Sequence, residues 1–167
     1  DVTNFKKLKK TFINFKPDYV FHLAAQSLVK KSYKNPILTY QTNTIGTLNV
    51  MECLRSLKNN CIAIIITSDK SYKNLEINRG YKEDDILGGI DPYSSSKASA
   101  ELIIQTYFNS FLKRKKNIKI GVARAGNVVG GGDWSEDRLI PDCMKSWSKN
   151  KKAIIRSPNS TRPWQHV

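Results

Sequence analysis

Short, mostly apolar runs separated by a long segment of helical periodicity place the strongest constraint on the fold. DYVFHLAA (residues 18–25) and CIAIIIT (residues 61–67) have the length and aliphatic content of strands buried in a parallel sheet. The segment between them, from Pro36 to Leu57, has apolar residues at helical spacing, namely Ile37, Tyr40, Ile45, Leu48, Met51, Leu54 and Leu57. A buried strand, a long helix and a second buried strand make a βαβ unit, whose two strands are parallel.

The alternation continues in the second half of the chain. A second long helix is expected from about Tyr93 to Lys115, with Pro92 at its start, where a missing N–H costs nothing. We expect a third strand at IKIGVARAG (118–126), another helix from RLIPDCMKSWSK (138–149) and a last short strand at KAIIRS (152–157). The pattern predicts an α/β fold with a mostly parallel sheet covered on both faces, and such sheets bind ligands beyond the carboxyl ends of their strands.

The net charge of +14, from 28 Lys and Arg against 14 Asp and Glu, is the most unusual compositional feature. The lysines cluster in KKLKK (6–10), KRKK (113–116) and KNKK (149–152), each on or just after an expected helix. No aromatic residues alternate with these clusters in the way that would stack on nucleic-acid bases. The clusters therefore favour solvated basic surfaces over a specific nucleic-acid site, and their field also suits a polyanionic small substrate such as a nucleotide.

Cysteine and hydropathy patterns bound the remaining classes. No apolar run approaches the roughly 18 to 20 residues that span a membrane, and the amino terminus lacks the pattern of a signal peptide. Three scattered cysteines, Cys53, Cys61 and Cys143, form no CxxC pair, which indicates reduced thiols in a cytoplasmic protein rather than disulfides or a zinc site. His22 and His166 have no accompanying cluster of carboxylates or thiols, so we expect packing roles for them and no metal.

The strand at 61–67 ends in a group of chemically reactive side chains. Ser68, Asp69 and Lys70 follow Thr67 directly, which places two hydroxyls, a carboxylate and an ammonium at the ligand-binding edge of the predicted sheet. Chains that leave a sheet often become polar, so this feature alone does not separate chemistry from solvation.

Tyr93 and Lys97 form a second constellation, in DPYSSSKASAE (91–101). Residues four apart lie on one face of a helix, one turn from each other. A phenol has a reference pKa near 10, and a neighbouring ammonium lowers that pKa by stabilising the phenolate. The pair therefore suits proton transfer from an alcohol that is being oxidised. This spacing is common on solvated helices, and only its position one crossover beyond Ser68–Lys70 favours a functional interpretation.

Five segments together resemble the extended short-chain dehydrogenase/reductase family and, within it, the nucleotide-sugar 4,6-dehydratases. They are HLAAQS (22–27), TSDKSY (67–72), GGIDPYSSSKASAE (88–101), ARAGNVVGGGDWSEDRLIPD (123–142) and TRPWQHV (161–167). The resemblance implies a Rossmann-like doubly wound parallel sheet, NAD as cofactor, and a nucleotide sugar, CDP-glucose in particular, as the substrate converted during deoxysugar synthesis. It also implies a homodimer or larger homo-oligomer formed through the helices at 36–57 and 93–115.

The resemblance implies a role for each reactive side chain. Tyr93 would take the proton of the sugar C4 hydroxyl, Lys97 would hold the ribose hydroxyls and lower the pKa of Tyr93, and Ser68 would bond to the C4 oxygen. Asp69 would be the acid at the C6 hydroxyl and Lys70 the base at C5. At the position of Lys70, many relatives that use dTDP-sugars have Glu, whereas those that use CDP-glucose have Lys. A lysine base needs a strongly lowered pKa, and the alternative for Lys70 is a salt bridge to Glu83, Asp84 or Asp85.

Further positions match binding contacts of the family. The cofactor contacts would be Asp1, Val2, Leu23, Ala24, Ala25 and Thr42, together with Tyr93 and Lys97. The substrate contacts would be Ser27, Ser68, Asn127, Arg138, Leu139, Ile140 and Arg162, and the fork of Arg162 suits the diphosphate. GNVVGGGDW (126–134) is not a GxGxxG fingerprint, and we interpret it as a loop on the substrate side; Ala24 and Ala25 could instead serve helix–strand packing.

The family pattern also sets expectations about what residues 1–167 contain. A glycine-rich first βαβ unit would precede Asp1 and a substrate domain would follow Val167, so we expect a partial NAD-binding domain, truncated at both ends and inactive by itself. A nucleotide-sugar 4-epimerase of the same fold is the alternative enzyme, but it has no need for the Asp69 and Lys70 pair. A non-catalytic dinucleotide-binding protein or a nucleic-acid binder that uses the basic surface is the alternative outside catalysis.

Overall fold

A three-stranded parallel sheet organises the first of two compact units in the computed structural model, which describes residues 1–167. The units are residues 1–124 and 125–167, and each is described by itself. The sheet has the order β1 (Tyr19–His22), β2 (Cys61–Ile66) and β3 (Ile118–Ala123). Tyr19 pairs with Ile62, and Cys61 pairs with Ile118. The predicted α/β class and the parallel pairing are confirmed.

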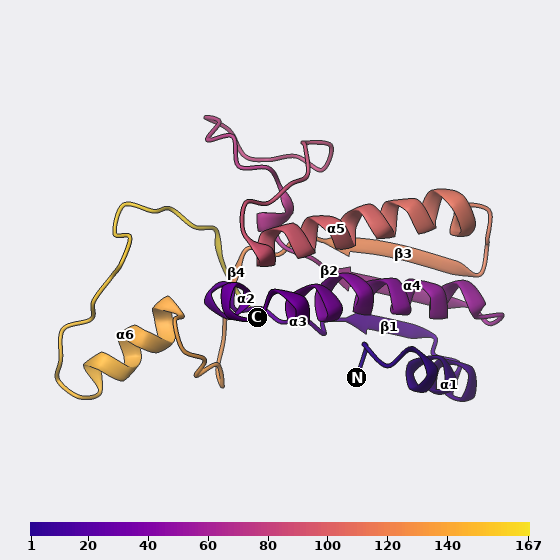
Figure 1. Cartoon of the computed structure of the whole chain (residues 1–167), viewed down its shortest axis with the longest axis horizontal. Helices are drawn as coiled ribbons and strands as arrows, with labels where there is room; N and C mark the ends of the chain where they lie inside the picture. Colours follow the sequence, from indigo (N-terminus) through magenta and orange to yellow (C-terminus); the bar gives the residue numbers. More distant parts are fainter. The chain divides into compact units, whose positions relative to one another are not determined.

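Two long helical segments connect these strands (Figure 1). The first consists of α3 (Pro36–Tyr40), a π-helical turn (Gln41–Ile45) and α4 (Gly46–Ser56), and the second of α5 (Pro92–Tyr107) and another π-helical turn (Phe108–Leu112). Both were predicted with nearly these bounds. Shorter helices stand at α1 (Phe5–Phe15) and α2 (Val29–Lys34), and a 3-10 turn stands at Asp69–Ser71.

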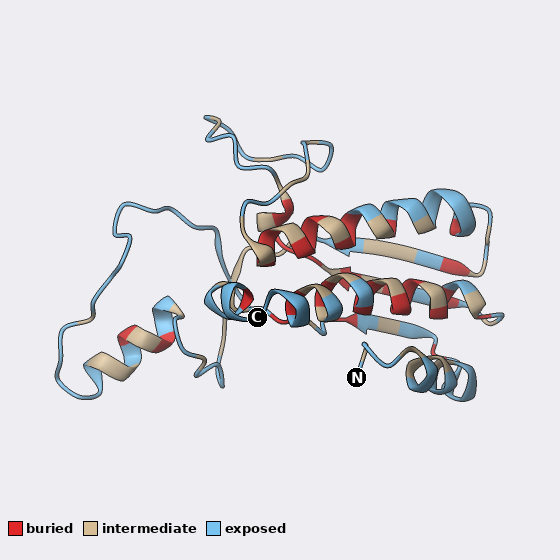
Figure 2. Ribbon diagram, in the orientation of Figure 1, coloured by how far each residue is buried: buried red, intermediate tan, exposed pale blue.

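Within this chain, helices α4 and α5 cover one face of the sheet. The strand order moves in one direction, so two crossovers of the same hand lie on the same side. The core therefore forms between these helices and the inner side of the sheet, from Val50, Met51, Leu54, Leu57, Cys61, Ala63, Ile65, Ile104, Leu112 and Ile118. Figure 2 shows buried residues along the facing sides of α4 and α5. Tyr19 and Phe21 on the other side are 65% and 66% exposed, so residues 1–167 cover only one of the two faces of the predicted doubly wound sheet.

The start of helix α5 is fixed by its sequence. Asp91 is the N-cap, and its carboxylate accepts hydrogen bonds from the backbone N–H groups of Tyr93 and Ser94, both at 3.0 Å. Pro92 occupies the first turn, where its fixed φ suits a helix and no N–H is needed. Gly89 lies against this turn, since an added Cβ would overlap Ser94. The helix therefore begins at a defined residue, which fixes the phase of the side chains that follow.

Residues 125–167 contain a small parallel pair of strands and one helix. β4 (Asn127–Val129) pairs with β5 (Trp164–His166), and α6 (Leu139–Trp147) lies between them in the chain. Gly126 allows the close approach of the two segments, because a Cβ there would be 2.8 Å from the ring of Pro163. The third strand was predicted for residues 118–126. It ends at Ala123, and residues 124–126 connect it to β4.

The predicted strand at 152–157 is wrong. Residues 152–157 have no regular structure, and Ile154 is 91% exposed. Two consecutive isoleucines in a polar segment gave a short apolar run, but no neighbouring strand pairs with it. None of the helices of the chain combines the length and the apolarity that crossing a membrane requires.

Candidate active site

The turn that follows β2 carries Ser68, Asp69 and Lys70 at the carboxyl edge of the sheet. The parallel ladder continues one residue beyond the strand, because the backbone N–H of Thr67 donates to the Ala123 carbonyl at 2.9 Å. The chain then leaves the sheet in a 3-10 turn, which begins with the Ser68 hydroxyl accepting from the backbone N–H of Lys70 at 3.2 Å. The same hydroxyl donates to the Asp69 carboxylate at 3.1 Å. Ser68 and Asp69 are therefore coupled by a hydrogen bond.

Tyr93 and Lys97 lie on the first turns of α5, which packs on this turn. They are 8% and 7% exposed. The Lys97 ammonium donates to the carbonyl of Ile66, the last residue of β2, at 3.3 Å. Its side chain thus joins the helix to the strand end from which the Ser68–Lys70 turn begins. The two constellations that the sequence separates by a crossover lie at one edge of the sheet.

Burial changes the acidity of Lys97. Removal of the ammonium from water lowers its pKa to about 8, while the nearby Glu101 carboxylate opposes this shift. An ammonium with a pKa close to neutrality exchanges its proton easily at working pH. The group is therefore suited to supporting proton transfer by Tyr93, whose ring it follows by one helical turn.

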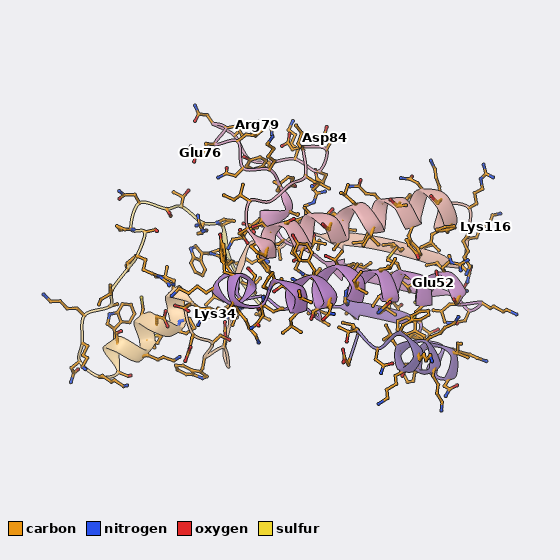
Figure 3. The ribbon with its side chains drawn as sticks, viewed as in Figure 1. Lys34, Glu52, Glu76, Arg79, Asp84 and Lys116 are labelled. Carbon is orange, nitrogen blue, oxygen red and sulfur yellow. The ribbon has the colours of Figure 1, made fainter.

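Lys70 lies over the aromatic ring of Tyr93. Its ammonium nitrogen is 5.9 Å from the ring centroid, within the range of a cation–π contact. The predicted alternative was a salt bridge with Glu83, Asp84 or Asp85, and Lys70 forms none of these. Asp85 pairs instead with Arg79 at 2.7 Å, and Figure 3 shows Arg79 and Asp84 on a loop that extends away from α5.

Asn43 connects the end of β1 to helix α5, a role that was not predicted. It is 1% exposed, and its amide accepts from the backbone N–H of Gln26 at 2.8 Å and donates to the Gln26 carbonyl at 3.0 Å and to the Ser96 hydroxyl at 2.9 Å. Thr44 donates to the carbonyl of Ser96 at 3.0 Å. The sequence feature that could have predicted this role is TNT (42–44), three polar residues within a helix of otherwise apolar spacing.

Glu101 and Arg124 are two further residues that sequence reasoning missed. Glu101 follows Lys97 by one turn of α5 and is 3% exposed, and Arg124 follows β3 directly. They form a buried ion pair at 2.8 Å. An acid on the same helical face as Tyr93 and Lys97 was the available signal for this pair.

The predicted cofactor positions other than Tyr93 and Lys97 lie at three places in the first unit: after β1, on the π-helical turn and at the amino terminus. Leu23 and Ala24 are exposed and Ala25 is half-buried, in the turn that leaves β1 at the carboxyl edge; Thr42 is half-buried on the π-helical turn. Val2 packs against Gly46, where an added Cβ would be 2.7 Å from its side chain. The Asp1 carboxylate accepts from the backbone N–H of Thr3 at 2.9 Å.

The other predicted substrate positions, apart from the exposed Ser27, belong to residues 125–167. Asn127 begins β4, and Arg138, Leu139 and Ile140 lie at the start of α6, where Arg138 pairs with Asp133 at 3.2 Å. Arg162 is exposed. Within this unit a cavity of about 200 Å³ is lined by Val128 to Trp134, Ile140, Pro141, Met144 and Trp164. Of the predicted substrate contacts, only Ile140 lines this cavity.

The histidines, cysteines and lysine clusters lie outside the turn that carries Ser68, Asp69 and Lys70. His22 is buried and bonds to Thr47 at 3.1 Å, and the three cysteines are buried free thiols. No three His, Cys, Asp or Glu side chains gather where a metal ion could bind. Lys116 precedes β3 and so lies at the amino edge of the sheet, opposite the turn (Figure 3).

Comparison with known proteins matches residues 1–167 to the family of GDP-mannose 4,6-dehydratase. The chain is 47% identical over 171 residues to CDP-glucose 4,6-dehydratase of Salmonella typhimurium, with 100% of this chain and 48% of that protein covered. It is 30% identical to dTDP-D-glucose 4,6-dehydratase of Dictyostelium discoideum, with 96% and 38% covered. The chain spans about half the length of the curated relatives it matches.

Solved structures give the same fold. UDP-glucuronic acid 4-epimerase of Bacillus cereus, in complex with UDP-glucuronic acid and NAD, has a TM-score of 0.83 and 24% identity, with 99% of this chain and 50% of that chain covered. dTDP-glucose 4,6-dehydratase of Bacillus anthracis, in complex with NAD, has a TM-score of 0.78 and 25% identity, with 99% and 49% covered.

Proposed function

This chain belongs to the GDP-mannose 4,6-dehydratase family, and we propose that the protein that carries it catalyses the NAD-dependent 4,6-dehydration of CDP-glucose to CDP-4-dehydro-6-deoxyglucose. The observation that carries the proposal is the meeting of two constellations at one sheet edge. Lys97, one turn after Tyr93 on α5, bonds to Ile66 at the end of β2, and the Ser68–Lys70 turn starts two residues later. Alcohol oxidation and water elimination require both sets.

The first step assigned to the chain's residues is removal of the C4 hydroxyl proton. Tyr93 accepts this proton as phenolate, and Lys97 stabilises the phenolate with its positive charge. Ser68 holds the C4 oxygen in place. When bound, NAD would supply the hydride acceptor for this oxidation and the hydride donor for the later reduction at C6. The C4 carbonyl makes the C5 hydrogen acidic, so that elimination of water between C5 and C6 becomes accessible.

Elimination then needs an acid and a base on the turn. Asp69 is the acid that protonates the departing C6 hydroxyl, and Lys70 is the base that removes the C5 proton. The contact of Lys70 with the ring of Tyr93, 5.9 Å from its centroid, supports this assignment because it holds the amine next to the residue that handles C4. A salt bridge to the following loop would have turned Lys70 away from Tyr93.

The first unit has features that fit NAD. An ammonium has three N–H donors, and one of those of Lys97 is directed at the Ile66 carbonyl, which leaves two for ribose hydroxyls. Ala24 and Ala25 at the end of β1 have no bulk that would keep a dinucleotide from the backbone. We assign the cofactor to residues 1–124, with Asp1, Val2, Leu23 and Thr42 as further contacts, and the start of the substrate-binding part to residues 125–167.

Substrate preference rests on the relative with 47% identity, whose name specifies CDP-glucose. We propose that Ser27 and the contacts in the second unit, Asn127, Arg138, Leu139, Ile140 and Arg162, hold the nucleotide sugar. The test is product analysis after incubation of the whole protein with NAD and with CDP-glucose, dTDP-glucose or GDP-mannose. We expect a 4-keto-6-deoxy product from CDP-glucose. A sugar that keeps its C6 hydroxyl and changes configuration at C4 would establish an epimerase instead.

Two further proposals concern the protein as an assembly. We propose a homodimer through the long helices, supported by the exposure of Leu102 on α5 and Phe108 after it, 55% and 41%; sedimentation of the whole protein tests this. We also propose that residues 1–167 by themselves do not turn over a nucleotide sugar, since they span about half of the matched relatives. Full turnover by this chain alone would contradict the second proposal.

A further inference from the structure

The Glu101 carboxylate contacts both ends of the turn that carries Ser68, Asp69 and Lys70. Thr67, immediately before the turn, donates its hydroxyl to Oε1 of Glu101 at 2.5 Å. The hydroxyl oxygen of Ser71, the last residue of the 3-10 turn, lies 3.5 Å from the same oxygen. Ser71 donates its hydroxyl proton to the carbonyl of Ser68 at 2.5 Å, which closes the turn. One buried oxygen atom therefore binds Thr67, the residue before the reactive side chains, and lies next to Ser71, the residue after them.

Arg124 completes the environment of this carboxylate. Its guanidinium binds Glu101 through two hydrogen bonds, Nε to Oε1 at 2.8 Å and Nη2 to Oε2 at 2.9 Å. Nη1 donates to the carbonyl of Glu83 at 3.0 Å, and the guanidinium lies 4.6 Å from the ring centroid of Tyr72. The side chains of Arg124 and Glu101 are only 12% and 4% exposed. The pair thus joins the end of β3, the turn after β2 and the following loop to helix α5.

We propose that Glu101 is a positioning residue that fixes the Ser68–Lys70 turn against Tyr93 and Lys97. This inference rests on the proposed dehydratase function for its kinetic part. Tyr93, Lys97 and Glu101 occupy successive turns of one helix face, four residues apart. The first two act on the sugar, and the third holds the turn that carries the acid and base of elimination. A single helix face therefore sets the distance between the oxidation residues and the elimination residues.

Glu101 has a second effect that a purely structural residue would not have. Burial lowers the pKa of Lys97 to about 8, and the Glu101 charge raises it against that effect. His22 at the end of β1 and Glu101 on α5 interact electrostatically with Lys97. Lys70 lies over the ring of Tyr93, one turn before Lys97, and Arg124 is paired with Glu101. Removal of the Glu101 charge lowers the pKa of Lys97 further, so Lys97 loses its proton at lower pH.

The test uses Glu101→Gln in the whole protein, with Glu52→Gln as a matched control. Glu52 also binds an arginine through both oxygens, Arg55 at 2.7 Å, but it lies on helix α4 (Figure 3). Misplacement of reacting groups by about 1 Å costs up to 10²-fold in rate. For Glu101→Gln we expect kcat to fall by about 10- to 100-fold, KM to change by less than about threefold, and the alkaline limb of the pH profile to move to lower pH. Glu52→Gln should change none of these.

A measurement that does not depend on activity separates this inference from the proposed function. In Glu101→Gln, backbone amides of residues 70–72 should exchange with solvent faster than in the parent protein, because their turn has lost its anchor. If the parent protein dehydrates no nucleotide sugar, the proposed function fails and amide exchange still tests the anchor. Unchanged exchange together with an unchanged alkaline limb would overturn the inference. Should Glu101→Gln not fold, Glu101→Gln with Arg124→Met removes both buried charges, and the same expectations apply to it.

Discussion

Mild acid should destabilise this fold through His22, the buried imidazole at the end of β1. Its Nε2 atom lies 3.1 Å from the Thr47 hydroxyl, which itself donates to the carbonyl of Asn43 at 2.7 Å. A hydroxyl has one proton to donate, so Thr47 accepts from His22, and the neutral ring carries its proton on Nε2. Burial first, and the positive charge of Lys97 second, lower the pKa of His22 from 6.5 to about 4.

The sign and the size of the effect follow from this difference in pKa. Between about pH 4 and 6.5 the unfolded chain binds a proton at His22 that the folded chain does not bind, so the free energy of unfolding falls as the pH falls through that window. The full difference corresponds to about 3 kcal/mol, of which about 2 kcal/mol is lost between pH 7 and pH 5. The stabilisation is fully present above about pH 6.5.

The measurement is urea unfolding of the whole protein at pH 7 and pH 5, compared with His22→Gln. Glutamine keeps an N–H donor near the position of Nε2 but does not titrate. We expect the parent protein to lose about 2 kcal/mol more than the variant between the two pH values. Equal losses in the two proteins, or an NMR titration of His22 in the folded protein with a midpoint at 6.5, would refute the reasoning.

Three further outcomes are expected in the whole protein. Tyr93→Phe removes the proton acceptor at C4 and should lower kcat by about 10²- to 10⁴-fold, as checked by steady-state kinetics. Lys70→Met should slow elimination but still allow C4 oxidation, so transient reduction of the bound nicotinamide should persist; its loss would argue against Lys70 as the C5 base. Gly89→Ala forces a Cβ into Ser94 and should lower the free energy of unfolding by about 1 to 3 kcal/mol, whereas Gly131→Ala, which meets nothing within 4 Å, should change it little.

The long elements of the first unit were predictable because their physics is local and periodic. Residues 36–57 and 93–115 have apolar spacing that only a helix can bury, and 61–67 has the composition of an inner strand. The chemistry at the end of β2 was predictable for a similar reason, since parallel strands deliver their following residues to one edge. The placement of Tyr93 and Lys97 beside that edge needed only the βαβ order.

Contacts between segments distant in the chain were not predictable. KAIIRS (152–157) had a strand's composition but no partner, while WQH (164–166), with less aliphatic content, pairs with β4 across a long connection. The roles of Asn43 and Glu101 were not predictable, because a buried polar group is stable only when its hydrogen-bonding partners are present. Those partners, Gln26 and Arg124, come from other elements. The periodicity of apolar residues describes one helix or strand at a time, so it does not indicate pairs of polar residues from different elements.

Tyr93, Lys97 and Glu101 share one face of α5, and this arrangement limits where residues can be inserted into or deleted from the chain. Each residue turns an α-helix by about 100°, so inserting or deleting one residue between Tyr93 and Glu101 would rotate Glu101 away from Thr67 and Arg124 while Tyr93 stayed with its N-cap. The exposed loop at residues 73–86 is not helical, so added residues there would not rotate any side chain away from its partner. They would cost only a little loop entropy. Relatives should therefore differ in length freely in that stretch and never within this part of the helix.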